Sequence, residues 1–333
     1  MAKTYISTVL GGPVPIVGNI NSFMDDAYSF PAMAGGRLTL AAATPVMTSS
    51  VPGATSIVYT PYRGLWTPVW NATQGMFVMV NAGGDVSQLL TDATKSPAAA
   101  ASSSVYDMFF WLDGTTPRCT RGPVWASTST RSMALTNLQG IRVNSTAITN
   151  GPGQYQGTYV GTIYTNGSAT CDWILGVPAS GGTAAWLGVW NTFNRVHVCT
   201  RVTDTGAPYT YMGGIRQARG STGMQVNYVV GVAEDSPIIS FQTTIQTPGV
   251  SGVYGSVSVG DDSISYFEIP GGICYSNGPA TNLDSVCAMY QKGYGEPMIG
   301  LHYAAALEMT GDTVNAVTFN TQSKAELAFT MPM

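Results

Sequence analysis

Short apolar runs separated by turn residues continue from Gly36 through most of the chain, and this pattern decides the fold class. In the clearest run, Arg195–Val202, valine or threonine alternates with arginine, histidine or cysteine. A period of two is typical of a strand with one buried face. The sequence therefore predicts an all-β protein made of β-sandwich or jelly-roll-like domains with a few short helices.

Similar strand-like runs lie on both sides of the middle of the chain, and 39 glycines and 19 prolines supply the turns between them. No fixed repeat is present, which disfavours a right-handed β-helix. The further predicted strands are Arg37–Ala41, Ser56–Tyr59, Leu65–Trp70, Met76–Val80, Val105–Leu112, Val124–Trp125, Ile141–Val143, Thr158–Tyr164, Cys171–Leu175, Ala184–Trp190, Met224–Gly231, Ile238–Ile245, Val253–Val259 and Ile264–Ile269.

Apolar residues at helical spacing predict three short helices. The first covers Asn19–Phe30, the second Gly83–Ala93 with Asp85 as its N-cap, and the third Asn282–Lys292. The apolar stripe of the first helix consists of Ile20, Phe23, Met24 and Ala27, and the adjacent pair Asp25 and Asp26 lies on its polar face.

Changes of texture along the chain predict three regions. Residues 1–33 form an N-terminal anchor or extension, residues 34–137 a first β-rich domain, and residues 138–333 a larger β-sandwich domain. The chain is long enough for each of the two domains to bury a core of its own.

Only 10% of the residues are charged, whereas 44% are hydrophobic. Ordinary soluble domains are roughly 25% charged. With so few surface charges, electrostatic repulsion between copies of such a protein is weak. We therefore expect it to pack against neighbours and to form a homotrimer. No run of Lys and Arg indicates nucleic-acid binding, and no apolar run of 18 residues indicates membrane insertion.

The charges are divided unevenly along the chain. Residues 1–219 hold 12 Lys and Arg against 8 Asp, a net charge of +4, and residues 220–333 hold 2 Lys against 10 Asp and Glu, a net charge of −8. Drift in composition would explain this division. The alternative is that the arginine-bearing region (37–219) and the glutamate-bearing region (234–326) contact each other.

The five cysteines are odd in number and show no CxxC pair, so we expect free thiols. The N-terminal stretch lacks the features of a secretory signal peptide. Together these features favour folding in a reducing cytoplasm. The cysteines are Cys119, Cys171, Cys199, Cys274 and Cys287.

Residues that could carry chemistry are few. His197 and His302 are the whole histidine supply and have no metal-binding spacing, so each is interpreted as a strand residue. The best acidic cluster is Asp261, Asp262 and Glu268. An enzyme that cleaves glycans needs a pair of carboxylic side chains, and this cluster could supply such a pair. Because Asp261 and Asp262 stand between two predicted strands, we interpret them as turn residues.

The aromatic residues Trp186, Trp190 and Phe193 could stack on a sugar ring, but they stand in an apolar run that favours core packing. The glycine-rich stretches lack the lysine and Ser or Thr of a phosphate-binding loop. We therefore expect no catalytic residue, no metal site and no cofactor, and the sequence leaves the binding residues unknown.

Four motifs resemble a family of virion proteins encoded by tailed bacteriophages. They are Arg121–Trp125, Gly157–Ile163, Thr183–Val196 and Gly300–Glu308, and the opening stretch Gly36–Tyr62 is similar as well. The resemblance covers about residues 36–310. It implies a particle-bound, trimeric β protein of the tail-fibre, spike or head-fibre type, and it supplies no catalytic residue.

These observations predict a virion structural protein that is not an enzyme. It would be a surface appendage, similar to a tail fibre or spike, that mediates particle assembly and attachment to the host surface. The alternatives are a capsid decoration or head-fibre protein and, less favoured, a glycan-degrading tailspike. The expected partners are further copies of the chain, other virion proteins, and a host surface glycan or protein. The expected location is the virion, after folding in the host cytoplasm.

Overall fold

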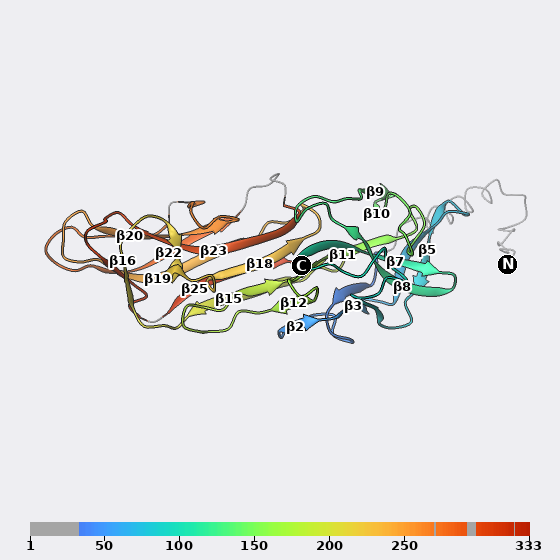
Figure 1. Ribbon diagram of the computed structural model, residues 1–333, viewed down its shortest axis with the longest axis horizontal. Coiled ribbons are helices and arrows are strands. Elements are labelled where there is room, and N and C mark those ends of the chain that lie inside the picture. Colours follow the sequence, from blue (N-terminus) through green and yellow to red (C-terminus); the bar gives the residue numbers. More distant parts are fainter. Residues whose placement is uncertain (1–32, 270, 292–297, 323) are drawn as a thin grey trace, which may run out of the picture.

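A computed structural model describes residues 33–269, 271–291, 298–322 and 324–333. The molecule is an elongated body of strands (Figure 1), and these strands form four sheets. Within the described ranges the single helical turn is the 3-10 turn η1, Ala218–Gly220. The prediction of an all-β protein is confirmed.

The largest sheet has 14 strands and runs along the length of the molecule. Its main path has the order β21-β20-β23-β18-β13-β12-β11-β10-β9, while β2, β7, β8, β14 and β17 pair beside this path. These strands are β2 (Val51–Ala54), β7 (Ser104–Asp113), β8 (Thr116–Val124), β9 (Leu135–Leu138), β10 (Ile141–Asn144), β11 (Thr158–Thr165), β12 (Cys171–Ile174), β13 (Ala185–Leu187), β14 (Val189–Asn191), β17 (Arg216–Gln217), β18 (Gln225–Val230), β20 (Tyr254–Asp261), β21 (Ile273–Tyr275) and β23 (Gly300–Thr310).

Three smaller sheets complete the fold. A six-stranded sheet has the order β15-β25-β19-β24-β16, with β22 on the other side of β19. A three-stranded sheet has the order β1-β3-β6, and β4 pairs with β5. These strands are β1 (Gly36–Thr39), β3 (Ser56–Pro61), β4 (Trp66–Asn71), β5 (Met76–Asn81), β6 (Val86–Leu89), β15 (His197–Asp204), β16 (Tyr209–Tyr211), β19 (Ile238–Gln246), β22 (Leu283–Gln291), β24 (Val317–Phe319) and β25 (Ala325–Pro332).

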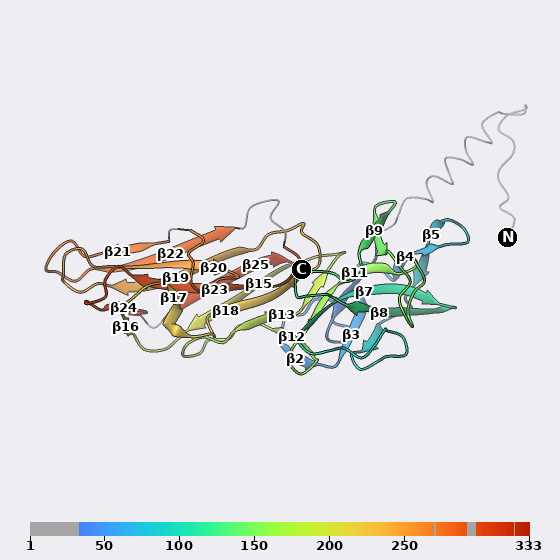
Figure 2. The same ribbon diagram turned by 45° about the horizontal axis from the view of Figure 1, so that its top comes forward.

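Toward the end of the body that carries β16, β20 and β24, on the left in Figure 2, the six-stranded sheet and the large sheet form a sandwich. The strands β19 and β22 lie against β20. Between the layers, the ring of Tyr228 on β18 meets that of Phe329 on β25, with 4.7 Å between ring centroids. This interlayer core is what holds the two sheets face to face.

At the other end, the small sheets pack on β7, β8 and β11 around aromatic side chains. Tyr59 and Phe110 have ring centroids 5.0 Å apart. A Cβ atom on Gly161 would lie 2.2 Å from the carbonyl oxygen of Trp190, so only glycine permits this approach of β11 and β14. The pairing of β7 with β11 shifts its register next to Gly161, which marks a β-bulge.

The boundary predicted between residues 137 and 138 falls inside β9. The strand β7, on its N-terminal side, pairs with β11 on its C-terminal side. One continuous cluster of buried apolar side chains contains both Leu38 and Met333. The residues on either side of the predicted boundary therefore share a sheet and a core.

Three predictions of local structure are wrong. The stretch Gly83–Ala93 contains strand β6, and Asn282–Lys292 contains strand β22, where helices were expected. The stretch Ile264–Ile269 is no strand. The helix predicted at Asn19–Phe30, like most of the N-terminal extension predicted for residues 1–33, lies outside the described residues.

The alternation predicted for Arg195–Val202 is confirmed in β15. His197, Cys199 and Arg201 are exposed, while Thr200 and Val202 are buried. β15 pairs along its whole length with β25, and Val202 on its buried face belongs to the continuous cluster of buried apolar side chains.

Candidate functional site

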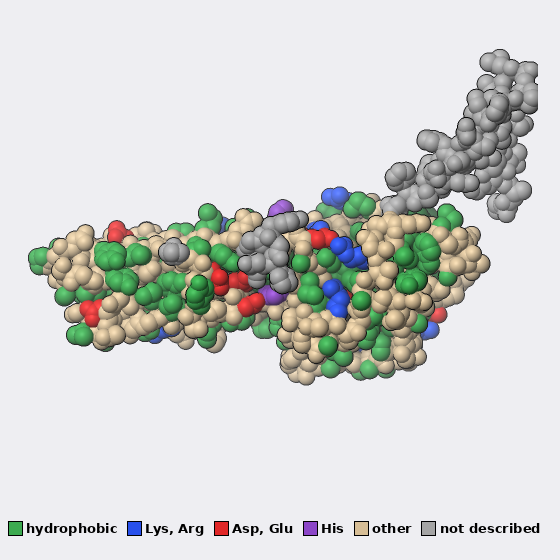
Figure 3. All heavy atoms as spheres, turned by 90° about the horizontal axis from the view of Figure 1, so that it is seen from above, with side chains coloured by type: hydrophobic (Ala, Val, Ile, Leu, Met, Phe, Trp, Pro, Cys, Tyr) green, Lys and Arg blue, Asp and Glu red, His purple; other side chains and the backbone are tan. Residues whose placement is uncertain are grey.

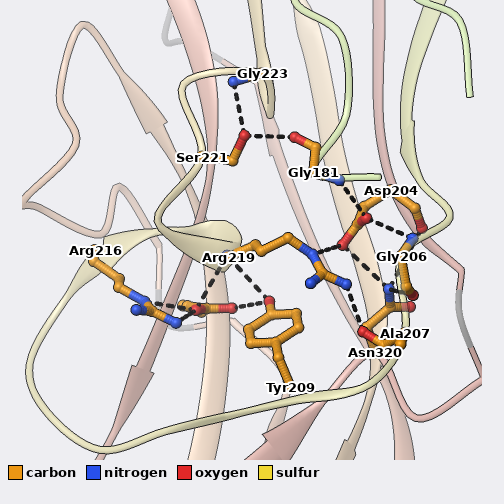
Figure 4. Close-up of polar contacts among 11 residues, drawn as sticks. Gly181, Asp204, Gly206, Ala207, Tyr209, Arg216, Arg219, Ser221, Gly223 and Asn320 are labelled. Atoms are coloured by element: carbon orange, nitrogen blue, oxygen red, sulfur yellow. Dashed lines mark hydrogen bonds and ion pairs between the residues drawn. The ribbon is translucent and has the colours of Figure 1, made fainter. Parts of the chain in front are cut away.

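A buried network of arginines and acids joins the two oppositely charged regions of the chain (Figure 4). At its centre is Glu308 on β23, whose side chain is fully buried. Nε of Arg216 on β17 donates to Oε1 of this carboxylate at 2.8 Å, and Nη2 lies 2.6 Å from the same oxygen in an ion pair. The hydroxyl of Tyr209 donates to Oε2. The backbone amide of Arg219 also donates to Oε1, at 3.2 Å.

Arg219 extends the network to the end of β15. Its Nε lies 2.6 Å from Oδ2 of Asp204, and its guanidinium stands 4.5 Å from the ring centroid of Tyr209. Arg219 has a φ of 59°, which non-glycine residues rarely adopt. The bonds from its backbone amide and from its guanidinium together hold this backbone conformation.

Asp204 receives four donors in all. The amides of Gly181 and Gly206 donate to Oδ1 at 2.7 and 2.8 Å, and Nδ2 of Asn320 donates to Oδ2 at 3.2 Å. The carboxylate thereby ties three loops to one point, as Figure 4 shows.

The pKa values of the two carboxylates of the network are shifted in opposite directions. Burial raises the pKa of Glu308, although the bonds from Tyr209 and Arg216 and the charge of Arg216 act against this rise. Burial also acts to raise the pKa of Asp204, but the hydrogen bonds from Arg219, Gly181 and Gly206 outweigh it and the pKa falls below its usual value. Burial and the neighbouring Glu308 raise the pKa of the Tyr209 hydroxyl. Glu308, Asp204 and Tyr209 therefore have a structural role, because other groups of the protein already occupy their hydrogen-bonding positions.

The predicted contact between the arginine-bearing and glutamate-bearing regions is confirmed within one chain. Besides Arg216 with Glu308, Glu234 lies 2.7 Å from Arg142 and 2.9 Å from Arg195. On the exposed face of the sandwich, Arg201 on β15 lies 3.4 Å from Glu326 on β25. The charge division therefore serves to connect segments that are distant in the sequence.

The acids of the predicted cluster are held by neighbouring strands. Asp261 is buried at the end of β20, and its Oδ1 accepts a bond from the hydroxyl of Tyr228 at 3.3 Å. Asp262 follows in the left-handed region at φ 55°, as expected for a turn. The backbone amide of Glu268 donates to the carbonyl of Val259.

The structure brings His302 to Asp262, a pairing that sequence reasoning missed. The Nδ1 atom of His302 lies 2.7 Å from Oδ2 of Asp262, and Tyr303 donates its amide to Oδ1 at 2.9 Å. His302 is a buried residue of strand β23, as predicted, and is separated from Asp262 by 40 residues. His197 is an exposed residue of β15 beside Glu234 and Asp235, which line the same shallow hollow.

Of the three aromatic residues considered for stacking on a sugar ring, one is buried in the core and two are partly exposed. Trp190 is fully buried, which confirms its prediction as a core residue. Trp186 is partly buried and stacks on Tyr164 with 5.8 Å between centroids, and Phe193 is partly buried. No one face of the sheet presents all three.

An exposed apolar hollow of about 560 Å³ lies where the described chain begins. Its walls include Met33, Arg63, Trp66, Met79 and Asn194. Trp66 on β4 is 51% exposed and Met79 on β5 is 38% exposed. Figure 3 shows hydrophobic side chains gathered at this end of the molecule. Sequence reasoning missed the hollow because its walls come from distant segments, although three large apolar residues stand there.

Two hydrogen-bonded features shape this hollow. The carbonyl oxygen of Gly35 accepts bonds from the amides of Tyr62, Arg63 and Gly64, so the chain folds tightly around it. A Cβ atom on Gly35 would lie 2.5 Å from the carbonyl oxygen of Gly64, and only glycine fits there. Asn194 donates Nδ2 to the carbonyls of Ala34 at 2.7 Å and Gly36 at 3.2 Å, which fixes the base of the hollow.

The cysteines of the chain are all free thiols, as predicted. Cys199 and Cys287 are exposed, and Cys119, Cys171 and Cys274 are buried. Burial raises the pKa of Cys119 to about 12. Since only the thiolate reacts, the buried thiols are protected both sterically and electrostatically.

We expect an alkylating reagent without reductant to modify Cys199 and Cys287 in the native protein and all five cysteines after denaturation. Intact-mass spectrometry would count the labels. Rapid native labelling of Cys119 or Cys171, or fewer than five labels in the denatured chain, would contradict this prediction.

Among the described residues, no group of three or more His, Cys, Asp or Glu side chains is placed to hold a metal ion. In the same portion of the chain, no helix has the length and apolar character needed to cross a membrane.

Comparison with known proteins gives only distant similarities. No family model matches the chain, and no curated protein is significantly similar to it. The chain is similar to one in the structure of the infectious bursal disease virus Gx strain, with a TM-score of 0.27 and 12% identity over 93% of this chain and 77% of that one. For a chain of the T13 IBDV viral particle, the TM-score is 0.25 with 10% identity, over 89% of this chain and 65% of that one. Similarity at this level carries no argument about function.

Proposed function

We propose that the protein is a structural component of a virus particle, and specifically a surface appendage of a tailed bacteriophage that resembles a tail fibre or spike. It would assemble as a homotrimer, join other virion proteins and attach the particle to a host surface glycan or protein, without catalytic turnover of its own. The observation that carries this proposal is an elongated all-β body with a surface that is poor in charge and rich in exposed apolar side chains (Figure 3).

The face that carries β21 and β22 illustrates this surface. Ile273 and Tyr275 on β21 are 45% and 48% exposed, and Leu283 and Met289 on β22 are 53% and 68% exposed. The strand β22 pairs with β19 and stands at the edge of its sheet. An edge strand with exposed apolar side chains and a single acidic residue favours association with another chain.

The second candidate function is a decoration or head-fibre protein on the capsid. The same surface and the same resemblance of motifs favour it, because both roles need a stable β body that packs against neighbours. Counting copies in purified particles separates the two: a few trimers per particle support the tail, and tens to hundreds support the capsid surface.

We expect the purified chain to sediment as a trimer at micromolar concentration. Met289→Lys should weaken this trimer by at least about tenfold, because an ammonium group would have to be buried at the subunit contact. Val314→Lys is the matched control, since Val314 is 79% exposed and lies outside β21 and β22. A wild-type monomer in sedimentation equilibrium, or equal effects of the two substitutions, would contradict the assembly proposed here.

A further inference from the structure

The exposed hollow beside β4 and β5 has walls that suit an apolar partner. Trp66 and Met79 line it and are large apolar side chains that remain partly exposed. A partner that covered this apolar surface would contribute a hydrophobic free energy of about 25 cal/mol for each Å² removed from water. The volume of about 560 Å³ is that of a site that takes several side chains of a partner.

We propose that this hollow binds the chain's own N-terminal segment, residues 19–30. Met33 lines the hollow, and Phe30 stands only three residues before it. Three extended residues span about 10 Å. The segment thus begins beside the hollow of its own chain, and a connection of this length gives a high effective concentration for binding in cis.

The sequence of the segment complements the hollow in two respects. Its apolar stripe, Ile20, Phe23, Met24 and Ala27, matches the apolar walls. Pro31 predicts that the helix ends at Phe30 and that the short connection to Met33 is extended.

Charge provides the second match. Arg63 stands at the rim, with its guanidinium 5.8 Å from the ring centroid of Tyr62 and in no ion pair with any described residue. Residues 1–33 contain two acids, Asp25 and Asp26, which stand in the sequence between Met24 and Ala27 of the predicted apolar stripe. Arg63 can therefore pair with these carboxylates while the stripe faces Trp66 and Met79.

The test is amide hydrogen exchange on the full chain. We expect residues 19–30 of the wild type to exchange at least about tenfold more slowly than the same sequence as a free peptide. Trp66→Ala should abolish most of this protection. Leu65→Ala is the matched control, because Leu65 is adjacent, 41% exposed and not among the wall residues, and it should leave the protection intact.

Charge reversal tests the pairing with Arg63. Arg63→Glu should accelerate exchange in the segment by about two- to fivefold, as expected for an exposed ion pair. Combining it with Asp25→Lys and Asp26→Lys should restore the slower exchange. Unprotected residues 19–30 in the wild type, or equal exchange in the Trp66→Ala and Leu65→Ala variants, would overturn the proposal.

A disulfide experiment tests whether the segment binds the hollow of its own chain. Met24→Cys with Met79→Cys, in a chain that also carries Cys199→Ser and Cys287→Ser, should form a disulfide within one chain on oxidation. This product migrates as a monomer on a denaturing gel. A disulfide that joins two chains would show that the hollow receives the segment of a neighbouring copy and would overturn the cis proposal.

Discussion

Glu308→Ala is expected to lower the free energy of unfolding by about 3–5 kcal/mol. The substitution leaves the guanidinium of Arg216 and the hydroxyl of Tyr209 without their shared acceptor inside the protein. The side chain of Arg216 is 32% exposed and can turn to water, but the Tyr209 hydroxyl and the Arg219 amide lose their acceptor inside the protein. Each buried donor left unpaired costs about 1–3 kcal/mol, and these costs add to the loss of the ion pair. Urea unfolding followed by intrinsic fluorescence measures the change.

The control is Glu326→Ala on β25. Glu326 also pairs with an arginine, but its partner Arg201 is 70% exposed and the two groups are 3.4 Å apart. An exposed pair of this kind contributes about 0–1 kcal/mol. Comparable losses for the two substitutions would show that burial does not set the strength of the Glu308 network.

Glu308→Gln separates charge from shape. Because burial raises the pKa of Glu308, the folded state disfavours the ionised carboxylate relative to the unfolded chain. At pH values above the raised pKa, this ionised form reduces the stability, and a neutral glutamine of similar size avoids that cost. We therefore expect Glu308→Gln to be less destabilising than Glu308→Ala at pH 7.

The two wrong helix predictions show where sequence reasoning stops. In β6, Val86 and Gln88 are buried and Ser87 and Leu89 are exposed, and Leu90 just after the strand is buried again, which is the alternation of a strand. A polar Gln88 on the buried face hid this alternation, and Leu89 and Val86 then matched a helical stripe. Nothing in the local sequence shows that Gln88 accepts a bond from the amide of Arg121 and donates to Ser96.

Strand β22 was predicted as a helix because apolar residues lie on its exposed face. Leu283 and Met289 are exposed although they are apolar, whereas Val286 and Ala288 are buried. The face of a strand is decided by its pairing partner, here β19, which is about 40 residues away in the sequence. The alternation in β15 was predictable because its exposed face is polar and its buried face is apolar.

The candidate sites were predictable only as general tendencies. The charge division predicted contacts between the arginine-bearing and glutamate-bearing regions, but not that Arg216 meets Glu308, which lies 92 residues further on. The hollow at Trp66 depends on Asn194, which reaches β1 from more than 150 residues away. Long-range pairings of this kind follow from the topology, which no local pattern encodes.

Arg121→Met is expected to lower the free energy of unfolding by about 3–5 kcal/mol. Arg121 on β8 is fully buried, and its guanidinium donates to the carbonyls of Leu89 at 2.9 Å, Asp92 at 2.8 Å and Ala98 at 2.9 Å. Leu89 is the last residue of β6, and Asp92 and Ala98 lie in the connection between β6 and β7, so one side chain supplies donors to the strand end and to the loop that follows it.

Burial lowers the pKa of Arg121, while the nearby Tyr106 and Asp92 act against this. The hydrogen bonds given above for its guanidinium all run to carbonyl oxygens, and the guanidinium also lies 5.8 Å from the ring centroid of Tyr106. Methionine retains much of the apolar stem but supplies no donor, and each carbonyl left without a partner costs about 1–3 kcal/mol. Arg118→Met on the same strand is the control, because Arg118 is 42% exposed and pairs with Asp113 near the surface. We expect it to change the stability by less than about 1 kcal/mol. Thermal and urea unfolding of both variants would decide, and a loss for Arg121→Met as small as that of the control would show that water replaces the guanidinium in the loop.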